Sequence, residues 1–125
     1  MARQKADDRG IAIEFAESDA FELERLRRKF QTVLDCGLFH MLDGDERPVY
    51  VASVASITES DGTLYVLCFS DIGPDIGPHP VAQDELRAAF HASTGWDVTG
   101  IEPGRIHTIY HDDGEPAWLA PVNRI

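Results

Sequence analysis

Hydrophobic residues follow two patterns along this chain, and each pattern predicts one type of element. Short stretches in which apolar residues alternate with polar ones or run together predict strands at residues 11–15, 31–36, 63–69, 96–102 and 117–122. Apolar residues spaced three or four apart predict helices at residues 22–30, 46–57 and 83–91, and the polar stretch 2–9 is compatible with another. Strand and helix therefore alternate three times before a closing hairpin. This order predicts an α/β fold whose sheet is mostly parallel, with a C-terminal antiparallel hairpin.

Breaks between these stretches refine the prediction. The acidic run 43–45 supplies a helix cap, and Pro48 falls in the first turn of the helix, where proline is tolerated. Stretch 63–69 is almost continuously apolar, which is typical of a strand buried on both faces. A turn at residues 60–62 precedes it. After it, the loop 71–80 contains Asp-Ile-Gly-Pro twice, and its glycines and prolines exclude regular structure. Residues 105–110 can extend the 96–102 strand beyond a break at residues 103–104.

Composition and charge narrow the classes of partner. The chain has 125 residues, 43% of them hydrophobic, which is enough for a single domain with its own core. It contains no apolar run long enough for a transmembrane helix, and its first residues do not form a signal peptide, so the expected location is the cytoplasm. The formal net charge is −11, which argues against nucleic-acid and membrane partners. The only basic cluster, at residues 25–29, shares a helix with glutamates and is interpreted as a solvated face.

The chemistry that stands out lies directly after the strand 31–36. That strand ends in Asp35, Cys36 and Gly37 turn the chain, and residues 38–40 add a leucine, a phenylalanine and a histidine. In open α/β sheets, ligands bind just beyond the carboxyl ends of the strands. An acid, a glycine turn, an aromatic ring and a histidine in that position predict a small-molecule site.

The cysteines and the remaining histidines do not predict a second functional site. Cys36 and Cys68 lie in or beside apolar strands and are predicted to be buried core residues rather than nucleophiles. The remaining histidines lack the short spacings that metal ligands show, so no metal site is predicted. They are His79, His91, His107 and His111.

Several segments together resemble the class I S-adenosylmethionine (SAM)-dependent methyltransferases, of the bacterial small-molecule type. Residues 19–21, Asp-Ala-Phe, resemble the acidic adenine-binding motif of that family. Residues 30–40 resemble its fourth-strand motif, residues 61–67 its glycine turn and fifth strand, and residues 95–103 with 117–119 its closing hairpin. The resemblance runs over about residues 3–120, and its specificity lies in the order and spacing of the motifs. It implies a Rossmann-like sheet and SAM as cofactor.

The resemblance also implies roles for individual residues, each with a structural alternative. The cofactor-binding residues would be Asp19, Ala20 and Phe21 at the adenine, with Asp35, Cys36 and Gly37 at the methionine end. Asp19 can equally cap a helix, and Asp35 can be an acid solvated at a strand end. Leu38, Phe39 and His40 would contact the acceptor substrate. His40 is the candidate catalytic base if the acceptor must lose a proton, and a histidine partly buried under the next helix is the alternative.

One part of the family pattern has no counterpart in this sequence. The family begins with a strand, a glycine-rich loop and a helix that approach the cofactor, and no such turn occurs here. Residues 1–125 are therefore interpreted as one partial domain, the C-terminal two-thirds of the fold. The predicted function is methyl transfer from SAM to a small molecule, with the missing strands supplied by a second copy or by a partner chain. Two alternatives are an inactive truncated domain that acts as an interaction module and an unrelated small binding protein.

Overall fold

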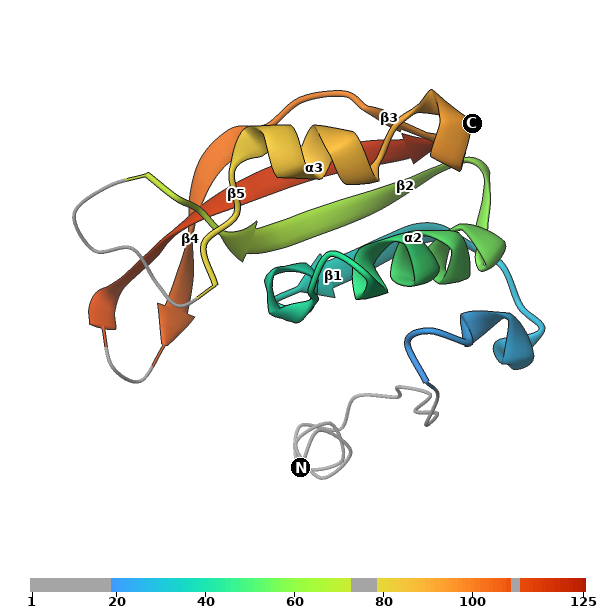
Figure 1. The fold of residues 1–125 in the computed structure, drawn as a ribbon, viewed down its shortest axis with the longest axis horizontal. Coiled ribbons are helices and arrows are strands. Elements are labelled where there is room, and N and C mark those ends of the chain that lie inside the picture. The colour runs from blue at the N-terminus through green and yellow to red at the C-terminus, as the bar shows by residue number, and fades with distance from the viewer. Residues whose placement is uncertain (1–18, 73–78, 109–110) are drawn as a thin grey trace, which may run out of the picture.

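The computed structural model describes residues 19–72, 79–108 and 111–125 (Figure 1). Its strands are β1 (Phe30–Cys36), β2 (Thr58–Phe69), β3 (Trp96–Val98), β4 (Glu102–Thr108) and β5 (His111–Arg124). Its α-helices are α2 (Glu46–Ser56) and α3 (Gln83–Ala89), and short 3-10 helices cover Leu23–Leu26, Phe39–Met41 and Ala92–Thr94. The helix predicted at residues 2–9 and the strand predicted at 11–15 lie outside the described residues.

The strands form one mixed sheet in the order β1-β2-β5-β3, with β4 also paired to β5. β1 and β2 are parallel, whereas β5 runs antiparallel to β2, β3 and β4. The α/β class and the antiparallel C-terminal strands are therefore confirmed. The mostly parallel sheet is not confirmed in the part of the chain that is described. The physical reason is that the long strand β5 pairs antiparallel with every neighbour it has.

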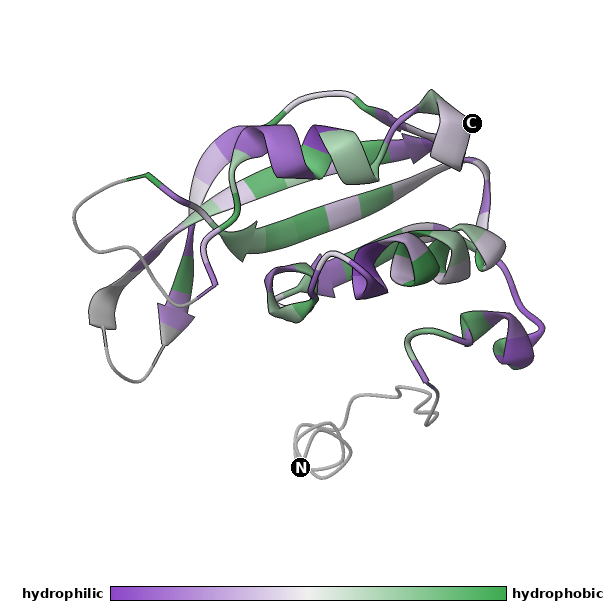
Figure 2. Cartoon of the chain, in the orientation of Figure 1, coloured by the Kyte–Doolittle hydropathy of each residue, from purple (hydrophilic) through white to green (hydrophobic). Residues whose placement is uncertain are grey.

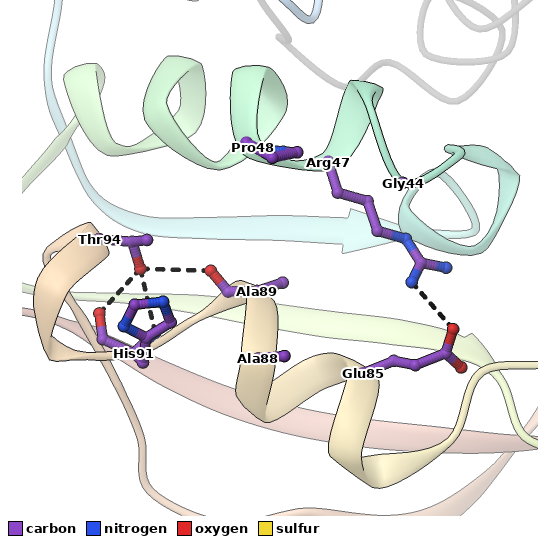
Figure 3. A pocket seen from close by; sticks show the side chains of 8 residues that line it. All are labelled: Gly44, Arg47, Pro48, Glu85, Ala88, Ala89, His91 and Thr94. Atoms are coloured by element: carbon purple, nitrogen blue, oxygen red, sulfur yellow. Dashed lines mark hydrogen bonds and ion pairs between the residues drawn. The ribbon is translucent and has the colours of Figure 1, made fainter.

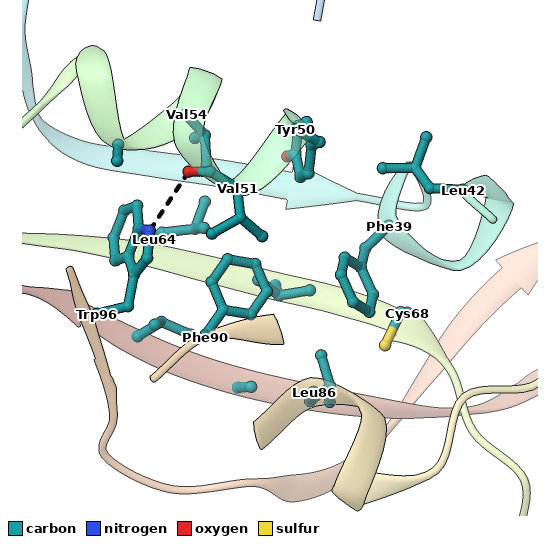
Figure 4. Packing of buried hydrophobic residues seen from close by; sticks show 14 of the residues in the cluster. Phe39, Leu42, Tyr50, Val51, Val54, Leu64, Cys68, Leu86, Phe90 and Trp96 are labelled. Carbon is teal, nitrogen blue, oxygen red and sulfur yellow. Dashed lines mark hydrogen bonds between the residues drawn. The ribbon is translucent and has the colours of Figure 1, made fainter. Parts of the chain in front are cut away.

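Both α-helices lie on the same face of the sheet, in front of it in Figure 1. The strand residues that point toward them, Leu64, Val66, Ala120 and Val122, are fully buried. Figure 4 shows how side chains of α2 and α3 meet those of β2 in this core. Figure 2 shows the same separation by hydropathy, with hydrophobic positions along β2 and β5 and hydrophilic ones on the outer side of α3.

The opposite face of the sheet is less well covered. Tyr65, between the buried Leu64 and Val66, is 38% exposed, and Leu34 beside it on β1 is 68% exposed. The prediction that residues 63–69 are buried on both faces is therefore wrong for this part of the strand. An apolar run indicates that burial is possible, but the covering layer has to come from other elements.

The helix predicted at residues 22–30 is also wrong. Only Leu23–Leu26 is helical, as a single 3-10 turn. Arg27 then adopts a left-handed conformation, with φ of 54°, which ends the helix, and β1 begins at Phe30. Leu23 and Leu26 are only half-buried, so little apolar contact is available to hold a longer helix in place.

Two predicted breaks fall elsewhere than expected. The 96–102 strand is interrupted after Val98, where the backbone N–H and the hydroxyl of Thr99 both donate to the Pro121 carbonyl, at 3.1 and 3.0 Å. The Pro103–Gly104 pair instead lies inside β4. Likewise, residues 60–62 form an irregularity within β2 rather than a turn before it. A Cβ on Gly62 would lie 2.8 Å from the Glu59 carbonyl oxygen, so only glycine is accommodated there.

The start of α2 was predicted correctly and matters for the site. Asp43 Oδ1 accepts hydrogen bonds from the backbone N–H groups of Asp45 and Glu46, and Glu46 Oε1 accepts one from the N–H of Asp43. This reciprocal pattern is a capping box, which satisfies the free donors at the first turn. It fixes the N-terminal end of α2 beside the C-terminal tip of β1 (Figure 1).

Candidate functional site

The site predicted from sequence centres on Asp35, at the C-terminal end of β1. Its carboxylate is 6% exposed and is held from two directions. Oδ2 accepts a hydrogen bond of 2.7 Å from the Tyr50 hydroxyl on α2, and Oδ1 accepts one of 3.0 Å from the Leu38 backbone N–H. Burial raises the pKa of Asp35, and these hydrogen bonds partly offset the shift. Burial and the neighbouring Asp35 carboxylate also raise the pKa of Tyr50.

The turn after Asp35 is built from the backbone. Gly37 adopts φ of +88°, a left-handed conformation that suits glycine, and its N–H donates to the Leu67 carbonyl at 2.9 Å. The turn is thereby fastened to the end of β2. Cys36, before it, is exposed, which corrects the prediction of a buried cysteine. Cys36 and the partly exposed Gly37 therefore lie at the surface beyond the strand end, where a ligand of an α/β sheet binds.

His40 packs against the end of β2. Its Nδ1 accepts a hydrogen bond of 3.1 Å from the Phe69 backbone N–H, and its ring stacks on the Phe69 ring at 4.2 Å between centroids. Burial lowers the pKa of His40, the nearby His79 lowers it further, and Glu115 opposes the shift. Since Nδ1 accepts a hydrogen bond from a backbone N–H, the neutral ring carries its own proton on Nε2. This placement supports the alternative of a histidine that fixes local structure.

The other two residues predicted to contact the acceptor differ from each other. Phe39 is fully buried, with its ring centroid 5.5 Å from that of Phe90 and the Arg47 guanidinium 4.6 Å from its centroid. Leu38 is 37% exposed. Phe39 lies inside the 3-10 helix on its buried side, whereas Leu38 precedes the helix, and the sequence alone did not show which of the two side chains points inward.

The second predicted segment, residues 19–21, forms a compact turn. Asp19 Oδ1 accepts a hydrogen bond of 2.8 Å from the Phe21 backbone N–H, so that amide already has a partner within the turn. Asp19 itself is exposed. The N–H of Leu23 donates to the Ser53 hydroxyl on α2 at 2.8 Å. Helix α2 thus holds Asp35 through Tyr50, and through Ser53 it holds Leu23, two residues after the second predicted segment.

Tyr50, Ser53 and Glu115 contribute to this region and were missed at the level of sequence. Tyr50 and Ser53 are three residues apart on the buried side of α2, and the apolar periodicity of that helix concealed their polar roles. The only signal was that both carry a hydroxyl within an apolar face. Glu115, on β5, is 7% exposed and interacts electrostatically with His40. Glu115 comes near His40 because β5 pairs with β2, and this pairing could not be predicted from the local sequence around Glu115.

A separate cavity of about 310 Å³ lies between α2 and α3 (Figure 3). Arg47 and Glu85 close one end of it with an ion pair of 3.1 Å, and His91 and Thr94 lie at the other. The backbone N–H of Ala82 donates to Glu85, and this bond is the main reason that the pKa of Glu85 is lowered; the ion pair with Arg47 adds to it. None of the site residues predicted from sequence lines this cavity.

The buried cysteine is not a nucleophile, and no metal centre is found among the described residues. Cys68 is fully buried, and burial, reinforced by the Asp35 carboxylate, raises the pKa of its thiol to about 12. A thiol with that pKa is not ionised near neutral pH and is a poor nucleophile. Over the described ranges, no group of three or more His, Cys, Asp or Glu side chains is arranged to hold a metal ion. Within the same residues, no helix is long and apolar enough to cross a membrane.

Comparison with known proteins connects this geometry to a family. No family model matches the chain. The 2-heptyl-1-hydroxyquinolin-4(1H)-one methyltransferase of Mycobacteroides abscessus is 32% identical over 111 residues, which cover 86% of this chain and 48% of that protein. A protein solved in a study of the conversion of a disulfide bond into a thioacetal group during echinomycin biosynthesis has a TM-score of 0.81 at 27% identity, over 98% of this chain and 60% of that one.

A third comparison includes the cofactor. The magnesium protoporphyrin IX methyltransferase of Synechocystis PCC 6803, solved with bound SAM, has a TM-score of 0.66 at 16% identity, over 99% of this chain and 53% of that one. This likeness concerns the fold alone. The match to the Mycobacteroides abscessus relative includes most of this chain, but the chain spans only about half the length of that relative.

Proposed function

Because the chain belongs to the class I SAM-dependent methyltransferase family, we propose that it takes part in methyl transfer from SAM to a small-molecule acceptor. The chain covers only 48% of the Mycobacteroides abscessus relative, so the proposal includes a further part of the fold, supplied by additional polypeptide or by a partner chain. The observation that carries the proposal is the acid–glycine turn at the tip of β1, fastened by Tyr50 on one side and by Leu67 on the other. The relatives are methyltransferases, and they give no support to the alternative of an inactive interaction module.

The residues present are suited to one wall of a SAM site. The carboxylate of Asp35 is already bonded to Tyr50 and Leu38, so we assign the methionine end to the backbone of residues 35–37 rather than to that side chain. The exposed carboxylate of Asp19 is assigned to the adenine amino group, with Ala20 and Phe21 beside the ring. SAM would supply a methyl group on a positively charged sulfur. The chain would supply position, which is the main requirement of a direct displacement.

The role proposed for His40 follows from its hydrogen bond. Protonating Nδ1 would break the bond from the Phe69 N–H, and burial also opposes the charged ring. We therefore propose that His40 fixes the 38–41 turn and offers Nε2–H as a donor, instead of taking a proton from the acceptor. Methyl transfer to an acceptor that ionises on its own needs no further base.

The proposed acceptor is a small, largely apolar molecule. The Mycobacteroides abscessus relative is named for a hydroxyquinolinone, a heteroaromatic compound, and we extend that class to this chain. Leu38 and Met41, which are 37% and 56% exposed, provide apolar surface next to the turn. The net charge of −11 argues against nucleic-acid substrates.

Calorimetric titration of the purified chain with SAM, and then with its demethylated product, tests the proposal. We expect saturable binding that Asp19→Ala weakens about ten-fold or more, because one hydrogen bond to a charged group is worth about 1.5–3 kcal/mol. Glu24→Ala is the control, since Glu24 is an exposed acid in the same segment. Absence of binding by a folded sample at millimolar ligand would show that the chain does not complete a cofactor site by itself. Equal loss in both variants would contradict the role of Asp19.

A further inference from the structure

The cavity between α2 and α3 is not used by the proposed methyl transfer. All of its lining residues belong to these two helices and the turns next to them, so its walls are complete without a further part of the fold (Figure 3). Its volume of about 310 Å³ is at the lower end of the range for small-molecule sites. Gly44, Ala88 and Ala89 leave this space open, because they carry little or no side chain.

Arg47, at one end of the cavity, is not fully bonded. Its Nη1 donates to Glu85 Oε1 at 3.1 Å, and its guanidinium lies 4.6 Å from the centroid of the Phe39 ring. Its Nε is buried and has no hydrogen-bond partner within the described ranges. A buried N–H without an acceptor is costly. An oxygen atom of a ligand in the cavity would supply that acceptor once the guanidinium turns toward it.

Glu85 determines which kind of oxygen suits this end of the cavity. Its Oε2 accepts from the Ala82 N–H at 2.7 Å and its Oε1 from Arg47, so the carboxylate is held beside the guanidinium. The two charges cancel, and an anionic ligand would be repelled by Glu85. A carboxylate oxygen accepts more than one hydrogen bond, so Glu85 can also receive an N–H from a ligand. The ion pair thus presents a donor beside an acceptor, which is complementary to the adjacent C=O and N–H of a neutral amide.

The remaining walls favour a flat, apolar body for such a ligand. Pro48, Ala88 and Ala89 line the cavity between its two ends and are apolar. The hydroxyl of Thr94, at the other end, is already bonded to the carbonyl groups of Ala89 and His91, so this threonine adds no free donor (Figure 3). Aromatic rings also stack well on a guanidinium group.

We propose that the cavity between α2 and α3 is a second small-molecule site, which binds a neutral aromatic amide or lactam. The carbonyl oxygen of the ligand accepts from Arg47, and its N–H donates to Glu85. Its ring lies against the apolar wall formed by Pro48 and the two alanines. This inference is independent of the proposed methyl transfer, since none of its arguments uses SAM.

Titration of the purified chain with isoquinolin-1(2H)-one, a bicyclic aromatic lactam, tests the inference without SAM. We expect saturable binding, with changes in backbone amide NMR shifts concentrated in residues 44–48 and 85–94. Two compounds of similar size are the comparison. Isoquinoline, which lacks the C=O and N–H, and 1-naphthoate, which has a carboxylate instead, are each expected to bind about ten-fold more weakly, because the hydrogen bonds at the ion pair are lost or opposed.

A pair of leucine substitutions tests the location. Ala88→Leu places a larger side chain in the cavity and is expected to abolish binding of the lactam. Gln83→Leu is the matched control, because Gln83 is exposed on the same helix and does not line the cavity. Leucine is a good helix former, so circular dichroism is expected to show both variants folded.

Glu85→Gln tests the preference for an amide. A glutamine oxygen can still accept from the Ala82 N–H, so the start of α3 is preserved. Removing the negative charge is expected to strengthen binding of 1-naphthoate several-fold, and unchanged affinity would overturn the role given to Glu85. The site itself would be overturned by three results: no binding of the lactam at millimolar concentration, shift changes centred on residues 35–41, or equal binding by the two leucine variants.

Discussion

Replacing Phe39 by alanine is expected to lower the free energy of unfolding by about 3–5 kcal/mol, the range for truncating a buried aromatic side chain. Phe39 is fully buried, lies 5.5 Å from the Phe90 ring, and carries the Arg47 guanidinium 4.6 Å above its own ring. The substitution removes all three contributions and leaves a cavity beneath α2 and α3 (Figure 4). Urea denaturation followed by the fluorescence of the buried Trp96 and Trp118 measures the change.

The neighbouring residue provides the control. Leu38→Ala, at a side chain that is 37% exposed, is expected to cost about 1 kcal/mol or less. If Phe39→Ala does not fold, Phe39→Leu gives a smaller loss that can still be compared with Leu38→Ala. A loss at Phe39 no larger than that at Leu38 would contradict the core role and return Phe39 to the acceptor-contacting residues suggested by sequence.

The elements that sequence predicted well are those fixed by local pattern. The strand at 31–36 is observed at Phe30–Cys36, and the helix with Val51 and Val54 on its inner side is observed at Glu46–Ser56. In both cases the apolar spacing and the observed burial indicate the same element, and for the helix the capping residues indicate it as well. The acid and glycine that follow β1 were located for the same reason, since the end of a strand can be read from the sequence around it.

The elements that sequence missed depend on contacts between distant segments. The leucines of residues 22–30 have helical spacing, but the fold gives them too little surface to pack against. Exposure of Tyr65 depends on which layer covers the second face of the sheet. The partner of Asp35 is Tyr50, fifteen positions later, on a helix whose orientation is set by the whole core. No local pattern contains this information.

Asp35 breaks the general rule that charged side chains stay in water, and this suggests where stability has been exchanged for function. A buried carboxylate with two hydrogen bonds is tolerated, but it is not a source of stability comparable to an apolar residue of the same size. Its bonds to Tyr50 and Leu38 give the following turn one conformation. A rigid turn is what a site built from backbone atoms requires.

Tyr50→Phe is therefore expected to lower the free energy of unfolding at neutral pH by about 1–3 kcal/mol, because it leaves one oxygen of a buried carboxylate without its donor. Asp35→Asn is expected to have the opposite effect. An asparagine oxygen can still accept from the Leu38 N–H and its amide can donate to the Tyr50 oxygen, while the cost of burying a charge disappears.

The dependence on pH separates this explanation from a simple packing effect. The pKa of Asp35 is raised in the folded chain, so its contribution is most favourable below the unfolded pKa and is lost as pH rises through the folded one. The stability advantage of Asp35→Asn over the wild type should thus be greatest near neutral pH and shrink on acidification. Each unit of pKa shift corresponds to about 1.4 kcal/mol of that advantage.

His40 does not disturb this comparison, although its contribution to stability also depends on pH, in the direction opposite to that of Asp35. Its pKa is lowered, so its contribution is present above the unfolded pKa and lost as pH falls through the folded one, equally in wild type and variant. Thermal unfolding of both proteins at a series of pH values gives the difference directly. An advantage that does not change with pH would show that folding leaves the pKa of Asp35 unshifted and would contradict this explanation. A variant less stable than the wild type near neutral pH would show that the Asp35 carboxylate is stabilised as an anion. In that case the side chain, and not only the backbone, would be suited to hold the ammonium group of SAM.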